Sequence, residues 1–247
     1  MVKSDSTTQL PLQFKPQPYL GKEDFMVSGC NCEAFQTIES WPDWPFFAIC
    51  LYGPEGCGKT HLAHMFSDNV AVATRQPYRI PTIKARDISL ESLKLFELSP
   101  CLIVEDLSEK VDNEALFHLY NQYRNEGGYI LFTAEKAPAR MFFPLPDLQS
   151  RLNIIPSIEI GEPDDEMLSA LIVKLFTDRQ VMVSPEIINY ILANMQRSFA
   201  FARKLVAETD NISLARKRAI SVPIVKEALQ VLNDDHQGEL FNLKDND

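Results

Sequence analysis

The chain has 247 residues, of which 45% are hydrophobic, and a formal net charge of −10. This length allows one large or two small domains with a substantial core, and the acidic balance disfavours a general nucleic-acid binder, which needs a basic surface. No apolar stretch reaches the length of a membrane span, the polar start lacks a signal-peptide core, and the five cysteines form no disulfide-like framework. We therefore expect a cytoplasmic protein without a membrane partner.

Composition and periodicity divide the chain into four predicted parts. Residues 1–22 are rich in proline and polar residues and are expected to form a flexible tail. Residues 23–160 carry alternating strand and helix patterns, and residues 161–233 carry helical patterns alone. Residues 234–247 hold mostly acidic and polar residues and are expected to form an acidic tail.

A phosphate-binding loop follows the first apolar run, Phe46–Tyr52. The loop reads G-P-E-G-C-G-K-T, a complete G-x-x-x-x-G-K-T pattern, and it leads into a helical stretch. Its glycines let successive backbone amides point at phosphate oxygens, while the lysine reaches the β- and γ-phosphates and the threonine ligates magnesium. The expected nucleotide-binding residues are Gly53, Pro54, Glu55, Gly56, Cys57, Gly58, Lys59, Thr60 and His61.

Strands and helices alternate after the loop, which predicts a parallel sheet between helices. The predicted elements are a helix His61–Asn69, a strand Tyr78–Lys84, a short helix Ser89–Phe96, a strand Cys101–Val104, a helix Asn113–Asn125 and a strand Tyr129–Thr133. The pair Gly127–Gly128 is expected to end the helix before the last of these strands.

After Ile160 the pattern predicts four helices and hence a small helical lid on the α/β base. They are Asp164–Arg179, Ser184–Met195, Ser198–Glu208 or a little beyond, and Ser221–Leu232. Residues 197–226 hold seven basic and two acidic side chains, against the acidic trend of the chain. Such a stretch is either a solvated helix face or a functional patch.

Two carboxylates, Glu105 and Asp106, end the apolar strand Cys101–Val104. In nucleotide-hydrolysing P-loop proteins this place holds one acid that supports magnesium and another that orients the attacking water. Glu105 falls at the magnesium position and Asp106 at the water-polarising position, although a small shift of the strand end would exchange them. The metal ligands are thus expected among Thr60, Glu105 and Asp106. The alternative is that the two acids merely close a strand.

Three further residues are assigned by their position relative to a γ-phosphate. The strand Y-I-L-F-T-A-E, residues 129–135, would bring Thr133 or Glu135 beside it as a sensor, although Thr133 could equally be an ordinary strand residue. Arg151, in the segment D-L-Q-S-R-L, is expected at an edge of the base from which it cannot reach the chain's own nucleotide but can reach a neighbour's.

The order of loop, acidic strand end, sensor strand, arginine segment and helical lid resembles the AAA+ ATPases. The segments T-A-E-K-A-P-A-R, P-D-L-Q-S-R-L and Q-L-P-L-Q-F make the chain similar to the Hda family, relatives of the bacterial replication initiator DnaA that switch it off. The resemblance covers nearly the whole chain. It implies ADP or ATP as the ligand, Arg151 as an arginine finger that acts in trans, and Arg197 in M-Q-R-S-F as the lid arginine on the bound phosphates. Arg203 is the second candidate for that lid role.

The resemblance also implies a partner for the first tail. Q-L-P-L-Q-F is similar to the hexapeptide that enters the hydrophobic pocket of the DNA polymerase sliding clamp. Gln9 would anchor the peptide by hydrogen bonds while Leu10, Leu12 and Phe14 fill the pocket. Near the other end, Q-G-E-L-F at residues 237–241 matches a shorter clamp-binding pattern or is an ordinary piece of an acidic tail.

The expected function is that of an adaptor that docks on DNA-loaded clamp and presents Arg151 to ATP bound on DnaA. DNA would be met only through the clamp, and self-association is a further possibility. An autonomous ATPase of the helicase-loader type is the alternative, because Lys59, Thr60 and both strand-end acids are present. A clamp-loader-like subunit is a third reading, but such a subunit should carry a collar domain.

Overall fold

The computed structural model describes residues 22, 25–75, 80–95 and 99–242. Its centre is a five-stranded, wholly parallel sheet with the strand order β2-β3-β4-β1-β5. The strands are β1 (Ala48–Tyr52), β2 (Thr82–Lys84), β3 (Cys101–Leu107), β4 (Tyr129–Ala134) and β5 (Ser157–Glu159). The predicted parallel sheet between helices is therefore confirmed. The predicted clamp peptide at residues 9–14 lies outside the described residues.

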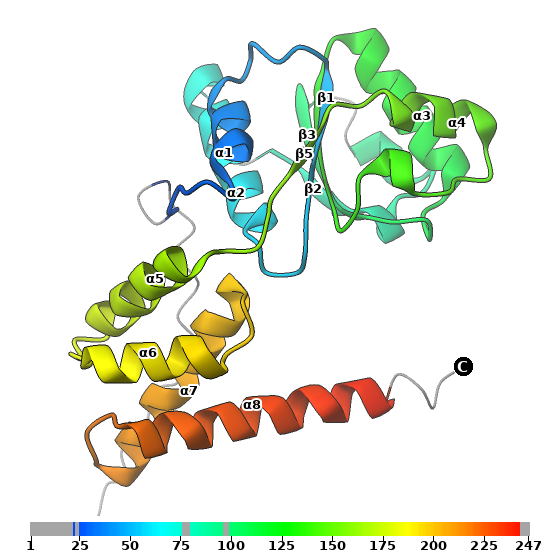
Figure 1. The fold of residues 1–247 in the computed structure, drawn as a ribbon. Helices are drawn as coiled ribbons and strands as arrows, with labels where there is room; N and C mark the ends of the chain where they lie inside the picture. The colour runs from blue at the N-terminus through cyan, green and yellow to red at the C-terminus, as the bar shows by residue number, and fades with distance from the viewer. Residues whose placement is uncertain (1–21, 23–24, 76–79, 96–98, 243–247) are drawn as a thin grey trace, which may run out of the picture.

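Helices cover both faces of the sheet (Figure 1). On one side lie α1 (Cys32–Glu39) and α2 (Lys59–Thr74), and on the other lie α3 (Asn113–Glu126) and α4 (Pro146–Asn153). Each side has its own apolar cluster, so successive residues of β1 are buried in turn against one helix layer and then the other. This two-sided burial explains why the strands read as continuous apolar runs.

Local signals account for several helix ends. The carboxylate of Asp112 accepts a hydrogen bond from the Ala115 N–H at the start of α3, and Gly127 ends that helix with a φ of +73°. The Ser198 hydroxyl accepts from the Phe201 N–H at the start of α7 (Phe199–Arg216). Capping of this kind satisfies N–H groups that the helix itself leaves unpaired, and glycine is the residue that adopts the left-handed end without strain.

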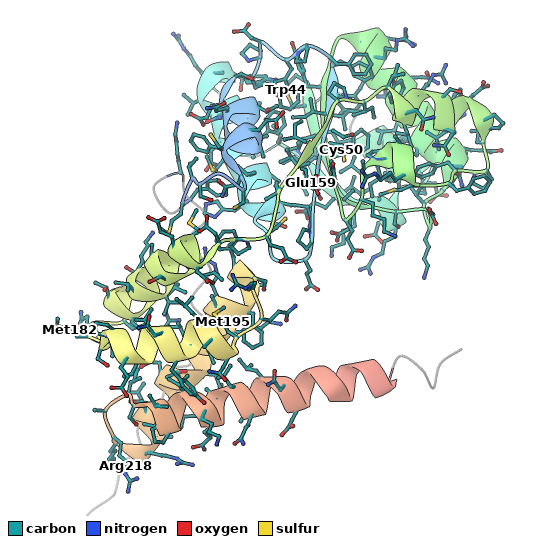
Figure 2. All side chains as sticks on the ribbon, viewed as in Figure 1. Trp44, Cys50, Glu159, Met182, Met195 and Arg218 are labelled. Carbon is teal, nitrogen blue, oxygen red and sulfur yellow. The ribbon has the colours of Figure 1, made fainter. Side chains whose placement is uncertain are left out.

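The lid consists of α5 (Asp165–Asp178), α6 (Pro185–Asn194), α7 and α8 (Val222–Asn242), packed around a separate apolar cluster. Figure 2 shows Met195 within it, and Arg218 at the end of the lid farthest from the base. The helix α8 continues to residue 242, so the predicted end of the last helix at Leu232 is wrong. The stretch 233–242 contains no proline and a single glycine, so nothing in it forces the helix to end.

Other boundaries also differ from the prediction. The second strand has only the residues Thr82–Lys84, and the expected short helix is a 3₁₀ turn at Ser92–Leu95. The sequence did not predict α1 or α4, each of which has only eight residues. Helices this short carry few turns of periodic pattern, and tertiary packing stabilises them. Within the described residues, no helix combines the length and apolar character that crossing a membrane requires.

Candidate nucleotide-binding site

The glycine-rich loop joins β1 to α2 and is closely enclosed. Gly56 and Gly58 have φ values of +74° and +107°, a conformation that residues with a side chain rarely adopt. A Cβ on Gly56 would lie 2.5 Å from the Cβ of Ala200 at the start of α7, and one on Gly53 would lie 2.2 Å from the carbonyl oxygen of Ile160. Only glycine therefore fits at Gly53 and Gly56, and the lid touches the loop directly.

Lys59 folds back over this loop. Its Nζ donates hydrogen bonds to the carbonyl oxygens of Gly53 and Pro54, at 2.7 and 2.8 Å. Burial raises the pKa of the neighbouring Cys57 thiol, so that group is neutral beside the ammonium. The Lys59 ammonium thus lies at the mouth of the loop, where it could exchange backbone oxygens for phosphate oxygens.

A cavity of about 460 Å³ opens between the loop, the segment before α1 and the lid. This volume is within the range of small-molecule sites. The lining residues are Phe25, Met26, Asn31, Glu55, Gly56, Gly58, Lys59, Thr60, His61, Asp106, Glu135, Leu171, Phe199, Ala200 and Arg203. Three of the expected loop residues, Gly53, Pro54 and Cys57, do not line the cavity. Each of them instead accepts a hydrogen bond from the Lys59 ammonium.

Aromatic residues form one side of the cavity. The ring of Phe25 packs edge-on against His61, with 5.0 Å between centroids, and stacks on Phe35 at 5.8 Å. Such a wall suits the flat face of a base. Phe25 and the lid residues Leu171 and Phe199 were not predicted from the sequence, because none of their segments carries a motif. Their positions in the sequence are the only indication of a role: Phe25 lies just before the first helix, and Leu171 and Phe199 lie among the apolar residues of lid helices.

Asp106 stands at the cavity, and Glu105 does not line it. The pairing of β3 with β4 shifts register between Val104 and Leu107, and Asp106 has a φ of +57°. Its backbone N–H donates to Thr133 Oγ1 at 3.2 Å, and its carboxylate lies 3.3 Å from Lys84 Nζ. A shift of this kind redirects a side chain at a strand end, and here it turns Asp106 towards the loop.

Thr133 and Glu135 have different surroundings. Thr133 is 2% exposed, and its hydroxyl accepts from the backbone of β3, which ties the two strands together. Glu135 lines the cavity. Of the two sensor candidates, the structure therefore brings only Glu135 to the site.

The residues expected to support magnesium lie in part at the cavity. Thr60 and Asp106 line it together with Lys59, which fits a nucleotide-bound Mg²⁺ held by one hydroxyl and one carboxylate. Within the described ranges, no group of three or more His, Cys, Asp or Glu residues could hold a metal ion by itself. The phosphates of a nucleotide would have to complete the coordination.

The two lid arginines are separated by the start of α7. Ala200 in the first turn packs on Gly56, and Arg203 lies three residues later on the same helix face, where it lines the cavity. Arg197 precedes the helix and lines a second hollow of about 330 Å³, which also borders the loop at Pro54, Glu55 and Cys57. There its Nη1 lies 2.6 Å from Asp165 Oδ1. The structure therefore brings Arg203, and not Arg197, to the cavity that Lys59 and Thr60 line.

Arg151 lies on the other side of the sheet, on α4, and lines neither hollow. Its guanidinium carbon is 4.1 Å from the centre of the Phe117 ring on α3 and 5.9 Å from that of Tyr120. In Figure 1 the sheet separates α3 and α4 from α2, which begins at the loop lysine. Arg151 is therefore separated from the chain's own cavity.

Both modules match sequence models of known protein families. The sequence model of the bacterial DnaA ATPase domain matches residues 22–155, more than half of the chain, and that of the Hda lid domain matches residues 164–229. An uncharacterized protein of Haemophilus influenzae is 28% identical over 76% of this chain and 82% of its own length. DnaA of Flavobacterium psychrophilum is 25% identical over 75% of this chain but 42% of its own length. The chain spans about half the length of the DnaA proteins it matches.

Solved structures show the same fold at lower identity. Domain III of Thermotoga maritima DnaA matches with a TM-score of 0.71 and 20% identity, over 88% of this chain and 97% of that domain. AMPPCP-bound DnaA of Aquifex aeolicus matches with a TM-score of 0.66 and 19% identity, over 91% of this chain and 72% of that chain. The expected α/β base with a helical lid is therefore confirmed as an AAA+ fold. The chain belongs to the DnaA-related AAA+ family of replication-initiation proteins and carries a lid of the Hda type.

Proposed function

We propose that this protein is an adaptor that binds an adenine nucleotide and promotes hydrolysis of ATP bound to DnaA. The observation that carries the proposal is the position of Arg151, which stacks on Phe117 across the sheet from the chain's own cavity. An arginine placed in this way cannot serve its own nucleotide without a large rearrangement. Supplied to a partner's site, it stabilises charge on the transferring phosphoryl group.

The chain's own nucleotide, ADP or ATP with Mg²⁺, would occupy the cavity between base and lid. Lys59 and Arg203 would contact the phosphates, Thr60 and Asp106 would hold the magnesium, and Phe25 would pack on the base. The DnaA of Aquifex aeolicus, which shares the fold, has been solved with AMPPCP bound. Because the cavity is lined by both modules, a bound nucleotide would set the angle between them.

Docking on the sliding clamp through Gln9, Leu10, Leu12 and Phe14 completes the proposal. The four residues precede the described domain, so a clamp could hold them without disturbing the fold. DNA would be approached through the clamp, which agrees with the acidic balance of the chain.

An autonomous ATPase of the helicase-loader type is the second candidate. The presence of Asp106 at the cavity favours it, because this carboxylate could support magnesium or orient a water. Asp106 also forms an exposed ion pair with Lys84, which a magnesium ion bound there would have to displace in either proposal.

The deciding experiment compares Arg151→Ala with the wild type in a mixture of ATP-loaded DnaA, clamp and DNA. The variant is expected to lower the stimulated hydrolysis by at least about 100-fold, because fingers supplied in trans contribute roughly 10³–10⁵ in rate in other systems. Its own nucleotide affinity and its clamp binding should stay near wild type. Arg124→Ala, which removes an exposed arginine from α3, is the matched control and should retain stimulation. Full stimulation by Arg151→Ala, or rapid hydrolysis by the wild type alone without any response to DnaA, would favour the autonomous ATPase.

A further inference from the structure

We propose that the tip of the lid binds the phosphate backbone of duplex DNA without regard to its sequence. The lid tip comprises residues 213–218, which end α7 and begin the turn to α8. It lies at the end of the lid farthest from the base, where Figure 2 labels Arg218. The proposed function brings DNA to this protein through the clamp, and the lid tip would add a direct contact.

Positive charge gathers around the lid tip, against the trend of the chain. Residues 211–226 hold four basic side chains and no acidic one, in a chain with a formal net charge of −10. All four are exposed: Arg216, Lys217, Arg218 and Lys226. Among the residues that the structure describes, only Arg216 of the four pairs with a carboxylate, that of Glu227. The charges of the other three therefore remain available to an anionic partner.

Hydrogen bonds hold the turn that carries these cations. The N–H of Arg218 donates to the carbonyl oxygen of Ser213 at 3.1 Å, and the Ser213 hydroxyl donates to the carbonyl oxygen of Arg218 at 2.5 Å. The two bonds connect the last turn of α7 to the residue that follows the helix cap. The backbone beneath the cations is therefore fixed before a partner arrives, which lowers the entropy lost on binding.

The backbone at Lys217 is of a kind that favours glycine. Lys217 is the cap at the carboxyl end of α7, with a φ of +51° in the left-handed region. Glycine adopts this conformation without strain, whereas a side chain makes it less favourable. A basic side chain there also interacts favourably with the helix dipole. The test must therefore separate a role at the helix end from a role in binding.

The phosphate backbone of duplex DNA fits such a surface. A few cations can contact only a few phosphates, so the binding should be weak and should fall steeply with salt. Docking on the clamp would hold the lid and the duplex in one assembly, where a high effective concentration makes a weak contact sufficient. The strengthening by the clamp rests on the proposed function, whereas the binding at low salt does not.

The first experiment measures binding of a short fluorescent duplex of mixed sequence over a series of KCl concentrations, by anisotropy. The double variant Lys217→Ser with Arg218→Ser should bind about tenfold more weakly than the wild type at low salt. The slope of the logarithm of the binding constant against the logarithm of salt concentration should shrink by about 0.9 for each cation removed. No binding of the wild type at low salt would overturn the proposal.

The charge-matched control is Lys110→Ser with Arg124→Ser. It removes two exposed cations from the base, so the net charge changes by the same amount. Its affinity for the duplex should stay within about twofold of wild type, because exposed charges beyond the screening length contribute little. If this control loses as much affinity as the lid-tip variant, net charge alone explains the binding and the lid tip is not the site.

Lys217→Gly separates DNA binding from a role at the helix end. Glycine suits the left-handed backbone, so the midpoint of thermal unfolding should be unchanged or higher, while the affinity for the duplex should fall about threefold. A lower midpoint with unchanged affinity would mean that the lysine serves only the end of α7, and would overturn its role in binding.

A last comparison tests the partner. Clamp loaded on circular DNA should bind the wild type more tightly than free clamp does, and the double variant Lys217→Ser with Arg218→Ser should lose this difference. If that variant binds the duplex normally but is impaired with free clamp or with vesicles of anionic lipid, the partner is a protein or a membrane and the proposal fails. If Arg151→Ala keeps full stimulation while the lid tip still binds the duplex, only the proposed function fails.

Discussion

Lys59 is the residue through which the loop would respond most directly to a nucleotide. Its ammonium is already at the loop, where it is held by two backbone carbonyl oxygens. Those oxygens carry only partial charges, whereas phosphate oxygens are anionic, so the exchange favours the nucleotide. The same loop packs against Ala200 of the lid at Gly56, so a shift of the loop on phosphate binding would also move the lid.

Lys59→Ala is therefore expected to weaken ADP and ATP binding by about 100-fold, the loss of roughly one or two charge-assisted hydrogen bonds. The fold should persist, because the lysine bonds only to its own loop. Calorimetric titration with each nucleotide measures the affinity, and the exposed Lys110→Ala is the control. Undiminished affinity in Lys59→Ala would reject the loop as the phosphate site.

At the scale of elements, the starting point of α7 determines which lid arginine meets the nucleotide. The helix begins at Phe199 with Ser198 as its cap, and this phase turns Ala200 and Arg203 to the loop. Arg197 lies one residue before the cap and pairs with Asp165 at the start of α5 instead. The predicted helix already began at Ser198, but which of its faces meets the loop depends on how the lid packs on the base, as the contact of Ala200 with Gly56 shows.

Arg203→Ala is expected to weaken the binding of the chain's own nucleotide by about tenfold, because a charged contact to the phosphates is lost. Arg197→Ala should change that affinity by no more than about twofold. Its ion pair is half exposed, so the loss should alter the free energy of unfolding by less than about 1 kcal/mol. Titration with fluorescent ADP compares the two variants, and the reverse order of effects would restore Arg197 as the lid cation.

The strand β3 shows a similar dependence on its neighbours. Its apolar run and two terminal acids were predicted from the sequence, with both acids expected at the site and only their roles left open. The register shift and the bond from Asp106 to Thr133 on β4 turn Asp106 to the cavity. Thr133, expected at the γ-phosphate, instead connects two strands. The hydrogen bond between β3 and β4 thus places Asp106 at the cavity and buries the Thr133 hydroxyl between the strands.

At the scale of the whole molecule, the proposed contacts with nucleotide, DnaA and clamp lie at separate places. The nucleotide cavity lies between base and lid, and Arg151 lies on the base across the sheet from α2. The predicted clamp peptide precedes both. This separation fits the proposed adaptor, which would hold one partner while it acts on another.

Replacing Gln9, Leu12 and Phe14 together by alanine is expected to eliminate clamp association. The midpoint of thermal unfolding should stay unchanged, because these residues precede the packed domain. Surface-immobilised clamp measures the binding, and differential scanning calorimetry measures the stability. If binding survives these changes but is lost on deleting residues 237–241, that segment is the anchor. If neither change removes it, the adaptor proposal fails.

The sequence by itself determined the phosphate loop, the parallel sheet, the helical lid and the family, because these depend on local patterns: glycine spacing, apolar runs, and helix periodicity with its caps. The tertiary structure alone decided that Arg203 and Asp106 face the cavity, that Glu105 and Arg197 do not, and that Arg151 stacks on Phe117. The physical reason is that the direction of a side chain follows from helical phase and strand register. Contacts between segments far apart in the chain set both, such as Ala200 on Gly56 and Thr133 on Asp106.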